Sequence, residues 1–404
     1  MQQASSAYIH IPFCRRRCYY CDFPIRVIGD GGGRVNRVQA MERYASLLCQ
    51  EIDQTAHWFP TSGLRTVFFG GGTPSLLPVS ELEKILLTLD QVYGLASGAE
   101  ISIEIDPATF DLDQLRAYQS LGINRYSLGV QAFDDELLAQ MGRTHRVDDI
   151  DRAIAQFEQV GIDNFSLDLI SGLPQQTLSQ WEATLEKALT LSPPHFSCYD
   201  LIIEPGTAFE RQVEAGTLPL PPDETAAQMY RFTQKRLTSA GYTHYEISNY
   251  AYPDYQCRHN RVYWENQPYY GFGMGAASFL GGQRLTRPRT HREYKSWVET
   301  LSRQNHIFAQ GEQFDVNERL LETLMLGLRL PEGIDLSAIA QQFGSAKVQR
   351  LIQTLKPYCD QNWVRLGKLD QSHWGQLQLT DPEGLLFSNT ILAHLFSAFS
   401  NEIR

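Results

Sequence analysis

The sequence predicts an α/β fold: an incomplete (β/α)6 TIM-like barrel, followed by a small, helical, winged-helix-like C-terminal domain. Short β-branched or apolar runs alternate with longer helical patterns through the first half of the chain. Strands that alternate with helices in this way form a parallel sheet, and six such units are two fewer than a closed eightfold barrel contains. Near the C-terminus three helical patterns precede a predicted strand pair, which is the order expected for the second domain. The 404 residues suffice for two or three domains.

The predicted barrel elements alternate between residues 8 and 201. An open barrel leaves a wide mouth for a large substrate, and functional residues of such sheets gather at the C-terminal ends of the strands. The predicted strands are Tyr8–Ile11, Thr66–Phe69, Glu100–Ile105, Arg125–Val130, Asn164–Leu169 and His195–Leu201. The predicted helices are Gln39–Asp53, Ser80–Asp90, Asp111–Leu121, Asp148–Gln159 and Thr177–Leu189.

The Pro-rich stretch Leu218–Pro222 ends this alternation and predicts a domain boundary, so that residues 1–222 form the barrel. We expect residues 223–311 to be a connecting region that begins with a helix at Glu224–Leu237, and residues 312–404 to be the C-terminal domain. The elements expected in that domain are the helices Asn317–Gly327, Leu336–Phe343 and Lys347–Lys356, the strands Trp363–Leu366 and Gln376–Leu379, and a final helix at Pro382–Phe399.

Composition and charge exclude several classes of protein. A net charge of −11 argues against a broad nucleic-acid surface, because phosphate binding needs clustered Lys and Arg. No apolar stretch approaches the roughly 18 residues of a transmembrane helix. The first residues lack a basic segment followed by an apolar one, so we expect no secretion and a location in the reducing cytoplasm. The basic run Arg15–Arg17 has two interpretations, a solvated loop or a site for an electron donor or an anionic carboxylate.

Three cysteines near the N-terminus, Cys14, Cys18 and Cys21, follow a short apolar run with the spacing C-x3-C-x2-C. Three thiolates on one tight loop can hold three irons of a [4Fe–4S] cube. The fourth iron is then open to a small molecule, in the way that catalytic metal sites keep one position free. A structural zinc site usually needs a fourth ligand, and we expect the nearby His10 to point into the packed interior. The Gly-rich insert Gly29–Gly33 that follows is expected to be flexible.

Polar residues mark the ends of the predicted strands. The glycines of Gly70–Pro74 let the backbone approach a ligand, and exposed N–H groups there can bind a carboxylate, although a tight turn is the alternative. Glu104 lies on an apolar strand and needs a partner, either a ribose hydroxyl or a neighbouring Arg. Gln131 ends the next strand, Arg143 can pair bidentately with a carboxylate, and Asp168 lies in the fifth strand.

Together these motifs resemble the oxygen-independent coproporphyrinogen III oxidase family of radical S-adenosylmethionine (SAM) proteins, over nearly the whole chain. The resemblance implies a radical SAM barrel in which Cys14, Cys18 and Cys21 hold a [4Fe–4S] cluster, and in which an electron from the cluster cleaves SAM. The residues that it implies as SAM contacts are Tyr8, Gly71, Gly72, Thr73 and Glu104. The true oxidases place a second SAM near positions that match Tyr20, Gln131, Arg143 and Asp168.

Two departures point to a haem-chaperone branch of that family. The oxidases resemble C-x3-C-x2-C-x-C, and the position of their fourth cysteine is Phe23 here. The run His259–Trp264 reads H-N-R-x-Y-W and resembles a motif of the chaperone branch. His259 can ligate haem iron, and Tyr263 and Trp264 offer flat faces to a porphyrin. The alternative is an aromatic loop in which hydrogen bonds satisfy the histidine.

The resemblance therefore implies a haem chaperone that binds haem, carries the cluster with SAM, and passes haem to acceptor haemoproteins, without coproporphyrinogen oxidase activity. The competing functions are the SAM-dependent oxidative decarboxylation of coproporphyrinogen III in porphyrin biosynthesis, and a radical SAM reaction on another substrate. A low-potential electron donor is expected as a partner. Respiratory acceptors, attachment to a membrane through such a partner, and a homodimer are consistent with the resemblance.

Overall fold

The computed structural model describes residues 3–29, 34–61, 63–301, 312–367 and 374–400. The chain forms two compact units. Unit 1 comprises residues 1–229 and 268–312, and unit 2 comprises residues 230–267 and 313–404. These units do not coincide with the three consecutive segments expected from the sequence, because the connecting region contributes to both. Most of the Gly-rich insert, residues 30–33, lies outside the described residues.

Unit 1 contains a parallel sheet with the strand order β11-β1-β4-β5-β6-β7-β8. The six predicted strands and the α/β fold class are confirmed, and within the described residues no pairing joins β8 to β11, so the barrel is open. Strand β11 was not predicted, because three residues carry no periodic pattern. The strands are β1 (Ser6–Ile11), β4 (Leu64–Gly71), β5 (Leu95–Ile105), β6 (Arg125–Gln131), β7 (Phe165–Ser171), β8 (His195–Asp200) and β11 (Tyr270–Phe272).

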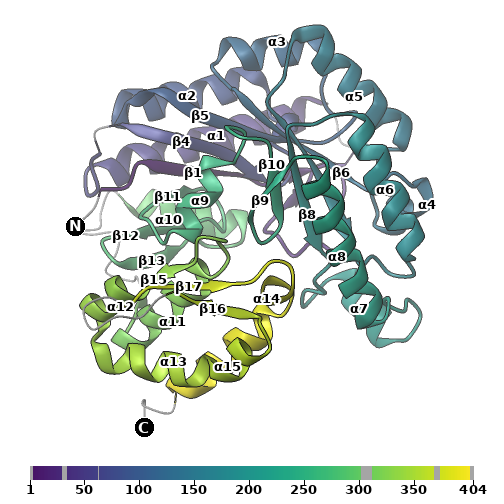
Figure 1. Ribbon diagram of the computed structural model, residues 1–404. Helices are drawn as coiled ribbons and strands as arrows, with labels where there is room; N and C mark the ends of the chain where they lie inside the picture. The colour runs from purple at the N-terminus through teal and green to yellow at the C-terminus, as the bar shows by residue number, and fades with distance from the viewer. Residues whose placement is uncertain (1–2, 30–33, 62, 302–311, 368–373, 401–404) are drawn as a thin grey trace. The chain divides into compact units, whose positions relative to one another are not determined.

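Helices connect these strands, and Figure 1 shows α2, α3, α5 and α6 along the outer side of the sheet. All five predicted helices are confirmed, with ends that differ by a few residues. Asp111, predicted as the first helical residue, instead caps α3 by accepting a hydrogen bond from the Gln114 amide. Two short helices, α4 (Asp135–Gln140) and α7 (Ala208–Glu214), were not predicted. The predicted helices are α1 (Arg34–Ala56), α2 (Val79–Tyr93), α3 (Leu112–Ser120), α5 (Val147–Val160) and α6 (Leu178–Thr190).

A buried ion pair joins α1 to the segment that returns to unit 1 after residue 267. Glu51 and Arg287 have fully buried side chains, and Glu51 Oε1 accepts a hydrogen bond from Arg287 Nε at 2.7 Å. Glu51 Oε2 accepts two more, from the Gly273 amide at 2.8 Å and the Tyr294 hydroxyl at 2.6 Å. The carboxylate is therefore fully satisfied, which a buried charge requires. The returning segment adds the hairpin β12 (Ala277–Leu280) and β13 (Gln283–Thr286), then α10 (His291–Leu301).

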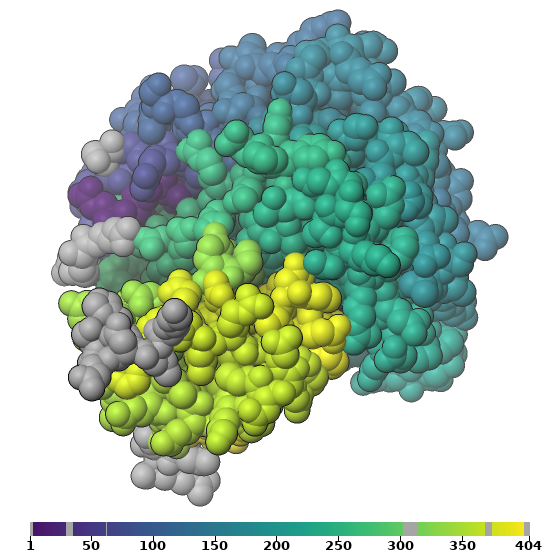
Figure 2. Space-filling view, viewed as in Figure 1, coloured from purple at the N-terminus to yellow at the C-terminus, as the bar shows by residue number. Residues whose placement is uncertain are grey.

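Unit 2 contains the expected helices followed by an antiparallel strand pair, and Figure 2 shows its C-terminal part in yellow-green and yellow. The predicted single final helix is wrong: the chain forms two helices that break at Phe387, whose ring stacks on Trp363 with centroids 4.2 Å apart. The elements are α8 (Asp223–Ser239), which starts in unit 1, β9 (Thr243–Glu246), β10 (Asn249–Ala251), α9 (Arg258–Trp264), α11 (Val316–Gly327), β15 (Ile334–Asp335), α12 (Leu336–Phe343), α13 (Ser345–Asp360), β16 (Val364–Leu366), β17 (Gln376–Leu379), α14 (Glu383–Leu386) and α15 (Ser388–Ser400).

Among the described helices, none has both the length and the apolar character needed to cross a membrane. The four cysteines outside the C-x3-C-x2-C motif differ in burial: Cys257 is buried, whereas Cys49, Cys198 and Cys359 are half-buried.

Candidate functional site

The three cysteines of the C-x3-C-x2-C motif lie on a loop that two short parallel strands, β2 (Phe13–Cys14) and β3 (Arg26–Val27), close at its base. All three thiols are half-buried and form no disulfide. The Cys21 amide donates to the Cys18 carbonyl at 3.2 Å. Arg17 Nη1 bonds the carbonyls of Cys21 and Phe23, so this arginine stabilises the loop. The loop is therefore ordered by its own backbone and by the Arg17 side chain.

The arrangement of the three thiols differs from that of a binding site for a single metal ion. Among the described residues, no three His, Cys, Asp or Glu side chains are arranged around one metal position. In a [4Fe–4S] cube each thiolate binds a different iron, so the sulfur atoms stand apart. Burial raises the pKa of the Cys14 thiol to about 12, against the hydrogen bond from Thr73, which lowers it. His10 is buried as expected, and its Nε2 bonds the Pro24 carbonyl at 3.0 Å.

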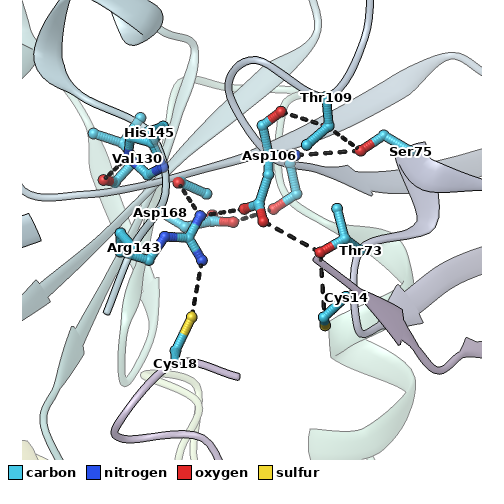
Figure 3. Close-up of polar contacts among 12 residues, drawn as sticks. Cys14, Cys18, Thr73, Ser75, Asp106, Thr109, Val130, Arg143, His145 and Asp168 are labelled. Carbon is cyan, nitrogen blue, oxygen red and sulfur yellow. Dashed lines mark hydrogen bonds and ion pairs between the residues drawn. The ribbon is translucent and has the colours of Figure 1, made fainter. Parts of the chain in front are cut away.

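Asp106 lies at the centre of the polar contacts beside this loop (Figure 3). Its Oδ1 forms an ion pair with Arg143, and its Oδ2 lies 3.2 Å from the Thr73 hydroxyl. Arg143 Nη1 lies 3.6 Å from Cys18 Sγ, and Thr73 Oγ1 lies 3.7 Å from Cys14 Sγ. One carboxylate thus joins two side chains that each contact a cysteine of the motif.

Asp106 and Gly129 were not among the site residues predicted from the sequence. A methyl group added at Gly129 would lie 2.6 Å from Asp106 Oδ1, 3.0 Å from Gln131 Nε2 and 3.3 Å from Arg143 Nη2. Glycine is therefore needed where these three side chains converge. Gln131 has a φ of 69° at an irregularity in the β6–β7 pairing, which places it in this group. Asp106 had a signal in the sequence, since it follows Glu104 by two residues and alternate strand residues share a face.

The Gly-Gly-Gly-Thr-Pro turn at the end of β4 holds the cluster loop rather than presenting open amides. A methyl group at Gly72 would lie 2.7 Å from the Phe13 carbonyl oxygen, so the approach of the two backbones requires glycine. The expectation that these N–H groups are exposed for a carboxylate is wrong for residues 71–73, because protein groups already accept from them. The acceptors are Glu104 Oε2 at 2.9 Å for Gly71, Ile11 O at 2.8 Å for Gly72, and Phe13 O at 2.7 Å for Thr73.

Glu104 and Tyr8 flank Gly70. A methyl group at Gly70 would lie 3.0 Å from Tyr8 Cε2 and 3.1 Å from the Glu104 carboxyl carbon. Burial, together with the carboxylates of Asp168 and Asp106, raises the pKa of Glu104 to about 8, against the Gly71 amide, which lowers it. No described Arg or Lys forms an ion pair with Glu104, so the alternative of a salt bridge is wrong. The partner of this carboxyl group is instead the Gly71 amide, which donates to Oε2 at 2.9 Å.

Stability should respond to the ionisation of Glu104 in protein free of cluster and SAM. The pKa of the carboxyl group is about 8 in the folded protein, above its ordinary value. The contribution of protonated Glu104 to the free energy of unfolding is therefore fully present below about pH 4.5 and is lost as the pH rises through 8. Each pKa unit is worth about 1.4 kcal/mol. Glu104→Gln should therefore unfold at a higher urea concentration than wild type at pH 9, with a smaller advantage at pH 6. The exposed Glu83→Gln serves as the control, and an advantage independent of pH would contradict the prediction.

Asp168 and Tyr20, two of the residues predicted to contact a second SAM, are both half-buried. Asp168 Oδ2 accepts a hydrogen bond from Ser127 at 2.6 Å, and its Oδ1 accepts one from Ser166 at 3.0 Å. Burial raises the pKa of Asp168, and these hydroxyls lower it. Tyr20 packs against Phe209 with ring centroids 6.4 Å apart, and burial, followed by the nearby Cys18, raises its pKa. Both predicted residues are thus held by protein contacts.

The H-N-R-x-Y-W motif forms α9 in unit 2. His259 is 1% exposed, and its Nε2 lies 2.8 Å from the Tyr263 hydroxyl, so the alternative of a hydrogen-bonded histidine describes this conformation. Burial lowers the pKa of His259 to about 3, which keeps the imidazole neutral. The buried Trp264 Nε1 has no hydrogen-bond acceptor among the described residues. Arg261 forms ion pairs with Glu265 and Glu332.

An open parallel barrel whose first strand leads into a C-x3-C-x2-C loop defines the radical SAM class. Residues 8–188 match the family model of the radical SAM superfamily, and residues 314–386 match that of the HemN C-terminal domain. The solved structure of coproporphyrinogen III oxidase (HemN) from Escherichia coli superposes with a TM-score of 0.79, at 24% identity, over 98% of this chain and 90% of that one. This structural similarity shows that the two chains share a fold. A radical SAM fold implies SAM and a [4Fe–4S] cluster.

Sequence relatives define the family more narrowly. The protein named heme chaperone HemW from Synechocystis is 48% identical, over 98% of this chain and 98% of its own length. The protein of the same name from Bacillus subtilis is 33% identical, over 98% of this chain and 100% of its own. The chain belongs to the HemW family of radical SAM proteins.

Proposed function

We propose that this chain is a haem chaperone, which binds haem, carries a [4Fe–4S] cluster with SAM, and passes haem to acceptor haemoproteins. The observation that carries the proposal is the 48% identity over nearly the full length of a protein named heme chaperone HemW. The H-N-R-x-Y-W helix and the exposed Phe23 at the position of the oxidases' fourth cysteine support it.

In this proposal Cys14, Cys18 and Cys21 hold the cluster, which when bound supplies an electron to SAM. The donor set fits, because it consists of three reduced, half-buried thiols on one closed loop. Tyr8, Gly71, Gly72, Thr73 and Glu104 would surround SAM. Arg143 has a buried Nε with no hydrogen-bond acceptor among the described residues, and a ligand carboxylate would satisfy it.

Haem would bind through α9. A neutral imidazole is the form that ligates iron, and burial keeps His259 neutral. Because its Nε2 bonds the Tyr263 hydroxyl, ligation through that nitrogen requires this hydrogen bond to break. The rings of Tyr263 and Trp264 would then cover a porphyrin face. Haem binding would therefore have to displace the Tyr263 hydroxyl from the proposed iron ligand, His259.

Replacing His259 tests the haem site. His259→Ala should shift the Soret band of the haem complex and weaken haem binding by about tenfold or more, because the iron loses its ligand. Tyr263→Phe should bind haem more tightly than wild type, since it removes the hydrogen bond that competes for Nε2. His394→Ala, an exposed histidine on α15, is the matched control. A His259→Ala complex with an unchanged Soret band and affinity would exclude this residue as the ligand.

Oxidation of coproporphyrinogen III is the second candidate function. It is favoured by the retention of Gln131 and Arg143 beside Asp106, and of Asp168 on the neighbouring strand. An anaerobic assay with reconstituted protein, SAM, reductant and coproporphyrinogen III separates the two functions. Protoporphyrinogen formed over several turnovers would establish an oxidase. No product, together with stoichiometric haem that passes to an apo-haemoprotein, would support the chaperone.

We further infer a cytoplasmic setting, a low-potential electron donor, and acceptors that include respiratory haemoproteins, to which the chain would attach at a membrane. A homodimer belongs to the same proposal. Sedimentation of the protein with and without haem tests the assembly.

A further inference from the structure

We propose that Asp106 is a positioning residue that aims the guanidinium of Arg143 at the sulfur of Cys18, and that this contact raises the reduction potential of the cluster. The inference rests on the proposed function in one respect, namely that a cluster occupies the cysteine loop. It concerns how residues of β5, β6 and the following loops act on one cluster ligand.

The contacts of Arg143 fix its orientation (Figure 3). The side chain is almost fully buried, and its Nη2 binds both Asp106 Oδ1 and the Gly129 carbonyl, the latter at 2.9 Å. The guanidinium is a rigid planar fork, so fixing one nitrogen fixes the direction of the other. The second nitrogen, Nη1, lies 3.6 Å from Cys18 Sγ. Asp106 therefore determines where this donor points.

Asp106 is itself held on three sides. Its amide lies 3.4 Å from the Ser75 hydroxyl, and its carbonyl accepts a hydrogen bond from Thr109 Oγ1 at 2.6 Å. Its second carboxylate oxygen, Oδ2, lies 3.2 Å from the Thr73 hydroxyl. Behind the ion pair, Gly129 leaves no room for a side chain. Asp106 therefore cannot move without disturbing the turn after β4 and the start of the loop after β5.

A donor at a cluster sulfur stabilises the reduced state more than the oxidised one, because reduction adds negative charge to the cluster and its thiolates. Hydrogen bonds to the sulfur atoms are among the features that set the potentials of iron–sulfur clusters. Arg143 adds a positive charge that is permanent, since arginine is not deprotonated in proteins. Loss of this contact should therefore make the cluster harder to reduce.

Two substitutions of Asp106 isolate the anchoring effect. Asp106→Asn and Asp106→Ala remove the same negative charge, but only Asn keeps an oxygen that can accept from Arg143. We expect the Ala variant to have the lower midpoint potential in the absence of SAM, by roughly a tenfold change in the ratio of oxidised to reduced cluster, or about 59 mV for one electron. Equal potentials in the two variants would overturn the inference. The measurement is a redox titration followed by electron paramagnetic resonance.

Arg143→Lys provides an independent test in case an Asp106 variant does not fold. Lysine keeps the charge but lacks the planar fork, so it cannot hold Asp106 and Gly129 while donating to Cys18. Its potential should fall below that of wild type, and an unchanged potential would contradict the sulfur contact. Iron and sulfide analysis of each sample shows whether the proposed function or only the redox inference fails. If the wild-type protein assembles no cluster, the proposed function loses its cofactor. If all variants carry intact clusters with equal potentials, only the redox inference is wrong.

Discussion

Cys18→Ser should leave the anaerobically reconstituted protein without a stable [4Fe–4S] cluster. Each cysteine of the loop would hold a different iron, and no other cysteine of the motif can replace Cys18, because Phe23 occupies the position of the fourth cysteine in the related oxidases. We expect the visible absorption of the cluster and the bound iron to fall to a small fraction of the wild-type values. Cys14→Ser and Cys21→Ser should behave in the same way.

Cys359→Ser is the matched control for this loss. Cys359 is also half-buried and reduced, but it lies on α13 in unit 2. Its substitution should leave iron content and absorption unchanged. If Cys18→Ser retained a full cluster, the assignment of the loop cysteines as ligands would be wrong. Circular dichroism of both variants shows whether the fold survives without the cluster.

Glu51→Ala should lower the free energy of unfolding of unit 1 by about 3–5 kcal/mol, the range for removal of one partner from a buried ion pair. Arg287, whose side chain is fully buried, would lose the carboxylate that compensates its charge. The Gly273 amide and the Tyr294 hydroxyl would lose their acceptor at the same time. Urea unfolding followed by fluorescence and circular dichroism measures the change.

The control removes an exposed ion pair of the same charge type. Asp113→Ala breaks the contact with Arg116 on α3, where both side chains are largely exposed and the pair contributes little. Its urea midpoint should match that of wild type. A Glu51→Ala midpoint as high as that of Asp113→Ala would mean that water enters the space and solvates Arg287.

Local patterns in the sequence were sufficient to predict the class of fold and the cysteine loop. Strands β1, β4, β5, β6, β7 and β8 were predicted because hydrophobic periodicity is a local property, and the C-x3-C-x2-C spacing places its ligands on one short segment. Helix α3 shows the limit of this information. Its start shifted by one residue, because Asp111 caps the helix rather than joining it.

Contacts between residues that are distant in the sequence could not be predicted, because they form only when the chain packs. Strand β11 exists because Tyr270–Phe272 pairs with Ala7–Ile9 of β1, and Glu51 finds Arg287 only when the returning segment packs on α1. Likewise, α14 and α15 separate where the Phe387 ring stacks on Trp363. None of these features has a periodic pattern of its own.

The candidate site divides in the same way. The cysteines, Glu104 and Arg143 were predicted from the sequence. The contacts of Asp106 with Arg143 and Thr73 form only in the folded chain. Folding also turned the amides of residues 71–73 toward protein acceptors and buried His259 against Tyr263. The physical reason is that a local pattern specifies which residues form an element, whereas the partner of a buried polar group depends on which distant atoms the packed core brings within hydrogen-bond distance.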